Sequence, residues 1–305
     1  MTTKTDATNQ PAAAREQYTT SAVTSQDGAT IGYRQIGQGP GLVLLHGSNV
    51  SGQDFTQLAE ALADAFTVYL PDRRGRGLSS PFGDDYGIQQ EVEDLDALLT
   101  RTGAHQVFGV SAGGLICLQA ALSLPAIHKI ALYEPALLLD GPARTAWLAR
   151  YDQEMAQGKV AAALVTCMKG LELGGPVMNA MPRWLLESFT NMAMYSEDKQ
   201  ASADAITMRK LAPTLHYDGL LLAEMSGQLE RFQAVRAEVL LLGGSKGLPY
   251  LKDSLAALEK TLPHVAKRVE FPGLEHGGAN NASKTNRGSK PELVAQELRR
   301  FFVEP

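Results

Sequence analysis

Residues 104–125 read AHQVFGVSAGGLICLQAALSLP, and the rest of the fold is organised around this stretch. Residues 107–110 are typical of a short buried strand, and residues 112–124 of an apolar helix that the following proline ends. Between them, GVSAG is a G-x-S-x-G turn in the strand-to-helix context that this motif requires. Its glycines leave room where strand and helix nearly touch, so Ser111 is predicted to project above a sheet edge.

The same pattern occurs again as GGSKG at residues 243–247. This second match also follows an apolar strand, but it continues as Leu-Pro-Tyr, so no helix starts directly after Ser245. It also leaves little chain for the rest of a catalytic set. The turn context therefore favours Ser111 over Ser245 as the nucleophile.

The 305-residue chain has the composition of an ordinary globular enzyme, with 44% hydrophobic and 20% charged residues. Its 28 basic and 33 acidic residues give a formal charge of −5, mixed along the sequence, which argues against a nucleic-acid or membrane-surface partner. The two cysteines, Cys117 and Cys167, have no metal-ligand spacing or disulfide framework, and they predict reduced thiols in a cytoplasmic protein. Neither a metal nor another cofactor is expected.

Strands alternate with helices over residues 21–136 and again over 228–305, which predicts a mostly parallel sheet with helices on both faces. Residues 137–227 have only helical periodicity and are predicted to form an inserted cap, or lid. Residues 1–20 are polar and alanine-rich without the apolar core of a secretion signal, so a disordered leader is expected. Whether the protein is a monomer or a homodimer stays open.

The predicted cap contains eight of the nine methionines and both tryptophans. Each of these residues taken alone is explained by helix packing. Together, adaptable thioether and aromatic side chains are also typical of the wall of an apolar substrate pocket. Trp147, Met181 and Trp184 are therefore candidate substrate-binding residues, although the sequence does not fix which side chains line a pocket.

A serine nucleophile needs a base to take its proton, and the chain has six histidines. His276 lies on a glycine-flanked loop just past the carboxyl end of a late strand, the edge at which sites assemble in open parallel sheets. The other five lie near the starts of strands, in the predicted cap or in the loop after residues 42–45. With Ser111 upstream, His276 is the predicted base.

The base in turn needs an acid that holds its tautomer and stabilises the imidazolium. The strand at residues 239–242 continues as GGSKGLPYLKD, which offers no carboxylate until Asp253, inside the next helix. The G-x-S-x-G turn at Ser111 is called the elbow below, and residues 112–124 the elbow helix. Glu134 ends the strand that follows this helix, so it should lie beside the strand that precedes Ser111. Glu134 is the predicted acid, with Asp253 or a Ser–His dyad assisted by backbone groups as the alternatives.

The oxyanion of a tetrahedral intermediate needs two N–H donors. Ala112 opens the elbow helix, where amides lack intrahelical partners and the dipole favours negative charge. The loop after His46 and Gly47 is expected to supply the second amide, from Ser48, with Asn49 as the alternative.

These motifs resemble the α/β-hydrolase fold superfamily in its form with one core and a cap. The resemblance covers the chain from about residue 21 onward and implies an eight-stranded, mostly parallel sheet with an antiparallel second strand and a lid over the catalytic edge. The arginine-rich turn looks like a network that fixes a loop. The segments that carry the resemblance are HGS (46–48), DRRGRGLS (72–79), GVSAGG (109–114) and GLEH (273–276).

The sequence departs from the commonest family pattern, in which an aspartate follows the strand after the cap, because GGSKG stands there. A minority of members, including some haloalkane dehalogenases, carry the acid after the strand before the cap, and Glu134 matches that position. Dehalogenases and epoxide hydrolases of this fold have aspartate at the elbow, so Ser111 speaks against both activities.

These features predict a serine hydrolase, specifically a carboxylesterase that cleaves small-to-medium apolar esters through an acyl-enzyme. The same constellation can host C–C bond hydrolysis, lyase chemistry or peracid formation, because fold and triad do not decide the reaction. A small-molecule receptor or signalling protein with a slow hydrolase site is a third hypothesis, from a different class of protein.

Overall fold

The computed structural model describes residues 18–203, 205–283 and 286–303, and a sheet of eight strands lies at its centre. The strand order is β1-β2-β4-β3-β5-β6-β7-β8, in which β2 pairs antiparallel with β1 and β4 while the other neighbours are parallel. The predicted fold class, with its antiparallel second strand, is confirmed. The strands are β1 (Thr19–Thr24), β2 (Thr30–Ile36), β3 (Gly41–Leu45), β4 (Thr67–Pro71), β5 (Gln106–Val110), β6 (Lys129–Tyr133), β7 (Glu238–Gly244) and β8 (Val265–Phe271).

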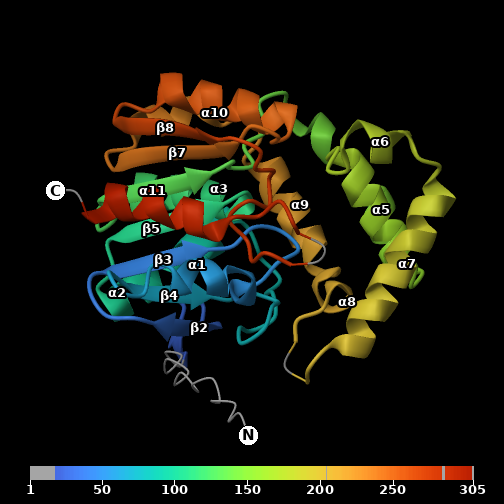
Figure 1. Cartoon of the computed structure of the whole chain (residues 1–305), viewed down its shortest axis with the longest axis horizontal. Coiled ribbons are helices and arrows are strands. Elements are labelled where there is room, and N and C mark those ends of the chain that lie inside the picture. Colours follow the sequence, from blue (N-terminus) through green and yellow to red (C-terminus); the bar gives the residue numbers. More distant parts are fainter. Residues whose placement is uncertain (1–17, 204, 284–285, 304–305) are drawn as a thin grey trace, which may run out of the picture.

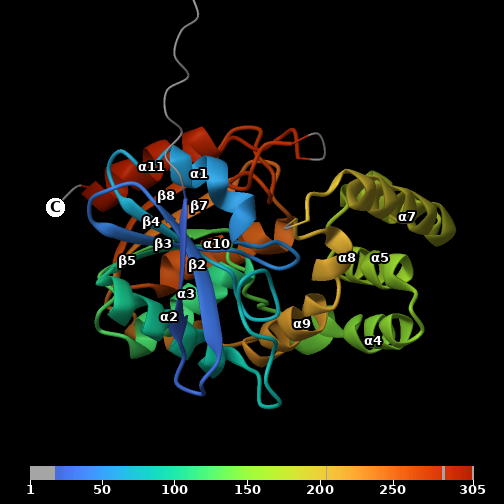
Figure 2. The same ribbon diagram turned by 90° about the horizontal axis from the view of Figure 1, so that it is seen from below.

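Helices cover both faces of this sheet (Figure 1, Figure 2). α1 and α11 pack on one face, and α2, α3 and α10 pack on the other. The described helices are α1 (Thr56–Glu60), α2 (Ile88–Thr102), α3 (Ala112–Ser123), α4 (Leu148–Ala156), α5 (Val160–Gly170), α6 (Gly175–Ala180), α7 (Arg183–Gln200), α8 (Met208–Leu211), α9 (Thr214–Glu224), α10 (Pro249–Thr261) and α11 (Pro291–Val303), with three short 3₁₀ helices at Gly52–Phe55, Pro142–Thr145 and Leu229–Ala234.

The central strands are buried on both faces, and their side chains alternate between two hydrophobic clusters. On β3, Val43 and Leu45 face the cluster of α2, α3 and α10, whereas Leu42 and Leu44 face the cluster of α1 and α11. Burying such a side chain contributes about 1.5–3 kcal/mol, so a slip in register would be costly. The carboxyl ends of β3, β5, β6 and β7 are thereby fixed side by side at one edge.

Residues 137–227, called the cap segment below, connect β6 to β7 and contain α4 to α9. α5, α6 and α7 lie away from the sheet in Figure 1, whereas α9 lies between them and the core. α9 contacts α3, and its Leu221 and the adjacent Met225 are buried in the same cluster as β3 and β5 side chains. α9 therefore joins the cap segment to the core.

The first strand begins inside the segment predicted as a leader, residues 1–20. Residues 1–17 lie outside the described residues, but Thr19 and Thr20 belong to β1 because they pair with Arg34 and Gln35 of β2. Across the described ranges, no helix combines the length and the apolar character that crossing a membrane requires.

Candidate active site

Ser111 joins β5 to α3 in a backbone conformation that few residues adopt. Its φ of 54° and ψ of −119° lie in a region that costs a non-glycine residue about 1–3 kcal/mol. Its N–H donates to the Tyr133 carbonyl, and its own carbonyl accepts from the N–H groups of Leu115 and Ala136, each at 3.1 Å. These hydrogen bonds offset the strain and hold Ser111 at the carboxyl edge of the sheet.

The two glycines of the elbow are required by close backbone packing. A Cβ on Gly109 would lie 2.5 Å from the carbonyl oxygen of Gly113, and a Cβ on Gly113 would overlap the carbonyl of Leu45. β5, α3 and the end of β3 therefore touch backbone to backbone, as the motif predicts.

His276 and Glu134 meet at the same edge. Nδ1 of His276 lies 2.7 Å from Oε2 of Glu134, whose side chain is fully buried. An ionised carboxylate only accepts hydrogen bonds, so Nδ1 carries the proton and Nε2 of the neutral ring keeps its lone pair. Tyr133 Oη donates to the Glu275 carbonyl at 2.8 Å and anchors the loop before His276. Burial, and secondarily Glu134, raises the pKa of Tyr133, which keeps this hydroxyl a donor.

The GGSKG segment at the end of β7, which lacks the aspartate of the commonest family pattern, holds the Glu134 carboxylate instead. The Gly244 N–H donates to Oε1 of Glu134 at 2.9 Å, and a Cβ on Gly247 would overlap this same oxygen. The backbone of Glu134 has a φ of 43°, and its N–H donates to the Leu242 carbonyl at 2.9 Å. The GGSKG segment thus binds the carboxylate of Glu134, the residue that follows β6.

Replacing Gly247 with alanine is therefore expected to disturb the contact between Glu134 and His276. The added methyl group would overlap Oε1, so the carboxylate must move. We expect kcat for an ester substrate to fall about 100-fold, since a displacement near 1 Å has effects of this size. Gly83→Ala is the matched control because its Cβ would meet no atom within 4 Å. Wild-type kcat in the Gly247→Ala protein would contradict this role for the segment.

The two predicted oxyanion amides belong to segments that meet at Ser111. Ser48 and Asn49, on the loop after β3, line the same cavity as Ser111. A Cβ on Gly47 would lie 3.0 Å from Cβ and 3.7 Å from Oγ of Ser111, so this loop packs directly against the elbow. Ala112 begins α3, where the first amides lack intrahelical partners.

A cavity of about 450 Å³ opens at Ser111 and His276. Among the described residues, no aspartate, glutamate, lysine or arginine lines this cavity. Burial raises the pKa of Cys167, which also lines it, to about 12, so this thiol stays protonated at neutral pH. Most of the apolar wall comes from the cap segment, including Leu164, Met168, Leu171, Met178, Phe189 and Leu215.

The three cap residues suggested by the sequence are not among those that line the cavity. Trp147 is buried in the helix packing, Trp184 is 68% exposed on α7, and Met181 lies in the turn between α6 and α7. A methionine-containing wall is present, but with other members. Helical periodicity does not fix how each helix is rotated toward a pocket, and this explains the difference.

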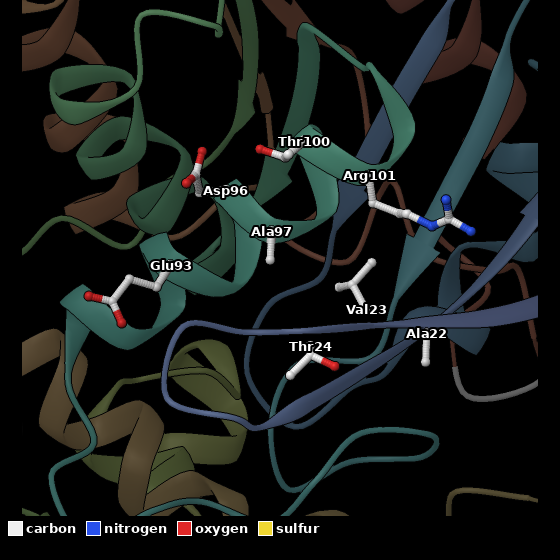
Figure 3. A pocket seen from close by; sticks show the side chains of 8 residues that line it. All are labelled: Ala22, Val23, Thr24, Glu93, Asp96, Ala97, Thr100 and Arg101. Atoms are coloured by element: carbon white, nitrogen blue, oxygen red, sulfur yellow. The ribbon is translucent and has the colours of Figure 1, made fainter.

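A second hollow, of about 640 Å³, lies between β1 and α2 (Figure 3). Its lining includes Val23, Thr24, Glu93 and Asp96, and contains no histidine, serine or cysteine. It therefore lacks the serine and histidine that line the smaller cavity, and the cavity at Ser111 is the candidate active site.

The alternative nucleophile and the alternative acid lie away from this cavity. Ser245 follows β7, where its Oγ accepts from the Gly273 N–H at 2.8 Å. Asp253 is exposed on α10, and Nδ1 of His276 is taken by Glu134. Neither Ser245 nor Asp253 lines the cavity at Ser111.

The arginine-rich turn after β4 forms a network of ion pairs, in agreement with the structural role suggested by the family resemblance. Its arginines at 73, 74 and 76 and the carboxylate of Asp72 are almost fully buried, and each has an oppositely charged partner that offsets its desolvation. The pairs are Arg34–Asp72 (2.9 Å), Arg73–Glu91 (2.7 Å), Arg74–Asp94 (2.7 Å) and Arg76–Asp218 (2.6 Å).

The eight-stranded sheet, the helices on both of its faces and the strand-to-helix turn at Ser111 define an α/β-hydrolase fold. Residues 42–288 match the sequence model of the alpha/beta hydrolase family, and the chain belongs to this family. The resemblance drawn from the motifs is thereby confirmed.

Curated relatives match parts of the chain. Over 96 residues it is 38% identical to the pimeloyl-(acyl-carrier protein) methyl ester esterase of Stenotrophomonas maltophilia. Over 116 residues it is 33% identical to the uncharacterized hydrolase YraK of Bacillus subtilis. The two matches cover 32% and 36% of this chain, and only 36% and 43% of the relatives' own lengths.

Solved structures are similar over nearly the whole chain. An alpha/beta hydrolase from Sphaerobacter thermophilus has a TM-score of 0.72 and 27% identity, covering 93% of this chain and 100% of that one. The esterase RhEst1 from Rhodococcus has a TM-score of 0.63 and 20% identity, covering 92% and 98%. The second likeness concerns the fold alone.

Proposed function

We propose that the protein is a serine hydrolase that cleaves small-to-medium apolar carboxylic esters through an acyl-enzyme. One observation carries this proposal: Ser111 and His276 line the same apolar cavity, while Glu134 binds the far nitrogen of His276. The match to a relative named as a methyl ester esterase, over about a third of the chain, gives further support.

In the first half of the reaction, Oγ of Ser111 attacks the ester carbonyl while Nε2 of His276 takes its proton. The negative charge moves to the carbonyl oxygen, where the N–H groups of Ala112 and Ser48 are the proposed donors. The tetrahedral intermediate then expels the alcohol, which leaves with the proton from Nε2. Glu134 stabilises the imidazolium throughout and is not itself protonated.

In the second half, water replaces the alcohol. His276 takes a proton from this water while the water oxygen attacks the acyl carbon. A second tetrahedral intermediate forms, and the same two N–H groups stabilise its oxyanion. When this intermediate collapses, the bond to Ser111 breaks, Oγ regains its proton from His276, and the carboxylic acid is released.

The substrate class follows from the cavity wall. No described aspartate, glutamate, lysine or arginine lines it, and most of its surface is aliphatic, thioether or aromatic. Burying an apolar acyl chain in such a space is favourable, because it removes apolar surface from water. A carboxylate would lose its hydration there without gaining a cationic partner.

A panel of p-nitrophenyl esters tests this function. With straight-chain acyl groups, kcat/KM is expected to rise by up to about fourfold per added methylene until the cavity is filled, because each buried methylene contributes ~0.8 kcal/mol. An acyl group of the same length that ends in a carboxylate should react at least ~10-fold more slowly.

The same panel tests the receptor alternative. Absence of hydrolysis across all esters, together with marked thermal stabilisation by one of them, would contradict the esterase proposal and favour a receptor.

We also propose a cytoplasmic location. Cys117 and Cys167 are both free and buried in the structure, which fits a reducing compartment.

A further inference from the structure

Helix α9 of the cap segment reaches into the core through one buried carboxylate. Oδ1 of Asp218 lies 3.0 Å from Nη1 of Arg73, and Oδ2 lies 2.6 Å from Nη2 of Arg76. The Asp218 side chain is only 2% exposed. Since Arg73 and Arg76 belong to the turn after β4, this carboxylate connects the cap segment to that turn.

The guanidinium of Arg73 also contacts the loop that follows β3. Its Nε and Nη2 donate to Glu91 at 3.0 and 2.7 Å, which fixes the plane of the group. Its Nη1 lies 3.0 Å from Oδ1 of Asp218 and donates to the carbonyl oxygen of Gly47 at 3.5 Å. Glu91 and Asp218 thus hold the Arg73 guanidinium so that it donates to the Gly47 carbonyl.

His46 holds the same carbonyl from another side. Its Nε2 is 3.0 Å from the backbone N of Arg73, which can only donate, so Nε2 accepts. Nδ1 therefore carries the proton and donates to the Gly47 carbonyl at 2.9 Å. Burial, with Arg76 and Arg73 nearby, lowers the pKa of His46 well below its usual range, which keeps the ring neutral and this tautomer in place.

The orientation of the Gly47 carbonyl also determines the direction of the Ser48 N–H, because both belong to one peptide group. In a planar trans peptide, the N–H of one residue points opposite to the carbonyl of the preceding residue. Because the Gly47 carbonyl points toward His46 and Arg73, the Ser48 N–H points to the other side of the loop. Gly47 packs against Ser111, and Ser48 lines the cavity, so that side is the active site.

We propose that Asp218 is a positioning residue: through Arg73, and together with His46, it fixes the Gly47–Ser48 peptide so that the Ser48 N–H is preset for the oxyanion. The inference rests on the proposed function, because it assumes that an oxyanion forms at Ser111. It implies that the packing of α9 against the core affects how well the Ser48 N–H stabilises the oxyanion.

Asp218→Asn tests the inference, because it removes the charge and keeps the shape. We expect kcat/KM for a p-nitrophenyl ester to fall about 10- to 100-fold through kcat, since loss of a full oxyanion donor costs more than misplacing one. Affinity for an aryl trifluoromethyl ketone, whose adduct with serine carries an oxyanion, should fall by the same factor. The number of active sites in each sample is measured by labelling with a fluorophosphonate until the reaction is complete. Each rate is divided by this number, so unfolded protein does not affect the comparison.

Asp94→Asn is the matched control. Asp94 forms a buried pair with Arg74, the next residue of the same turn, but the described hydrogen bonds of the Arg74 side chain go to Asp94, Asp27 and Ser25 and not to Gly47. Both variants should lose thermal stability, because each removes one carboxylate that pairs with a buried arginine. Only Asp218→Asn should lose activity per labelled site; an equal loss in both would overturn the inference.

His46→Phe tests the second donor to the Gly47 carbonyl and leaves the carboxylates that pair with the arginines unchanged. It removes the Nδ1–H donor, and kcat and ketone affinity are again expected to fall while KM changes little. Unchanged kcat and ketone affinity in Asp218→Asn or in His46→Phe would refute the positioning role. Failure of the wild-type protein to hydrolyse any ester or to be labelled at Ser111 would instead refute the proposed function.

Discussion

Replacing Ser111 with alanine is expected to lower kcat for a p-nitrophenyl ester by about a million-fold, the loss typical of removing the nucleophile of a serine hydrolase. The residual rate would come from the oxyanion donors and the cavity, which the substitution leaves in place. The fold should persist, because Ser111 is held by its backbone hydrogen bonds and alanine keeps all of them.

Fluorophosphonate labelling, read by intact mass and mapped to a peptide, supplies the direct measurement. The wild-type protein should gain one adduct on Ser111, and the Ser111→Ala protein should gain none. Ser245→Ala is the control, since Ser245 lies in the other G-x-S-x-G match but away from the cavity. An adduct on Ser245, or full activity without Ser111, would overturn the assignment of the nucleophile.

The elbow and the sheet could be predicted because local sequence determines them. The apolar run before Ser111, the glycines around it and the apolar helix after it each require the same strand-to-helix turn. The position of Glu134 was predictable for a similar reason: residues that follow neighbouring parallel strands arrive at one edge. In the structure, Glu134 and Ser111 follow the paired strands β6 and β5.

The cavity wall could not be predicted residue by residue. Helical periodicity identifies apolar faces on α5 and α7, but several helices compete to bury such faces. Phe189 turns out to line the cavity, whereas Trp184 on the same helix is exposed. Similarly, nothing in the sequence joins Asp218 to Arg73, because this pair depends on how α9 docks against the core.

The role of GGSKG was also hidden, although its departure from the family pattern was visible. A missing aspartate indicates only that the acid comes from another place. The structure adds that Gly244 donates to the Glu134 carboxylate and that Gly247 leaves it room. Such a role requires knowing that β6 and β7 are neighbours.

Glu134→Gln is expected to lower kcat about 10,000-fold, as an amide in the acid position does in serine proteases. The Glu134 carboxylate accepts from two donors, the Gly244 N–H and Nδ1–H of His276. A glutamine has one acceptor oxygen and one NH₂ group, so it cannot satisfy both donors. The backbone N–H of Gly244 cannot change, whereas the imidazole can shift its proton.

The glutamine oxygen should therefore face Gly244, and its NH₂ group should face Nδ1. His276 would then carry its proton on Nε2, the nitrogen that must receive the proton of Ser111, and the base would be blocked. Steady-state kinetics with a thermal unfolding control measures this effect, and Asp253→Asn should retain activity within about twofold, because distant surface changes rarely matter. A fully active Glu134→Gln protein with an inactive Asp253→Asn protein would transfer the role of the acid to α10.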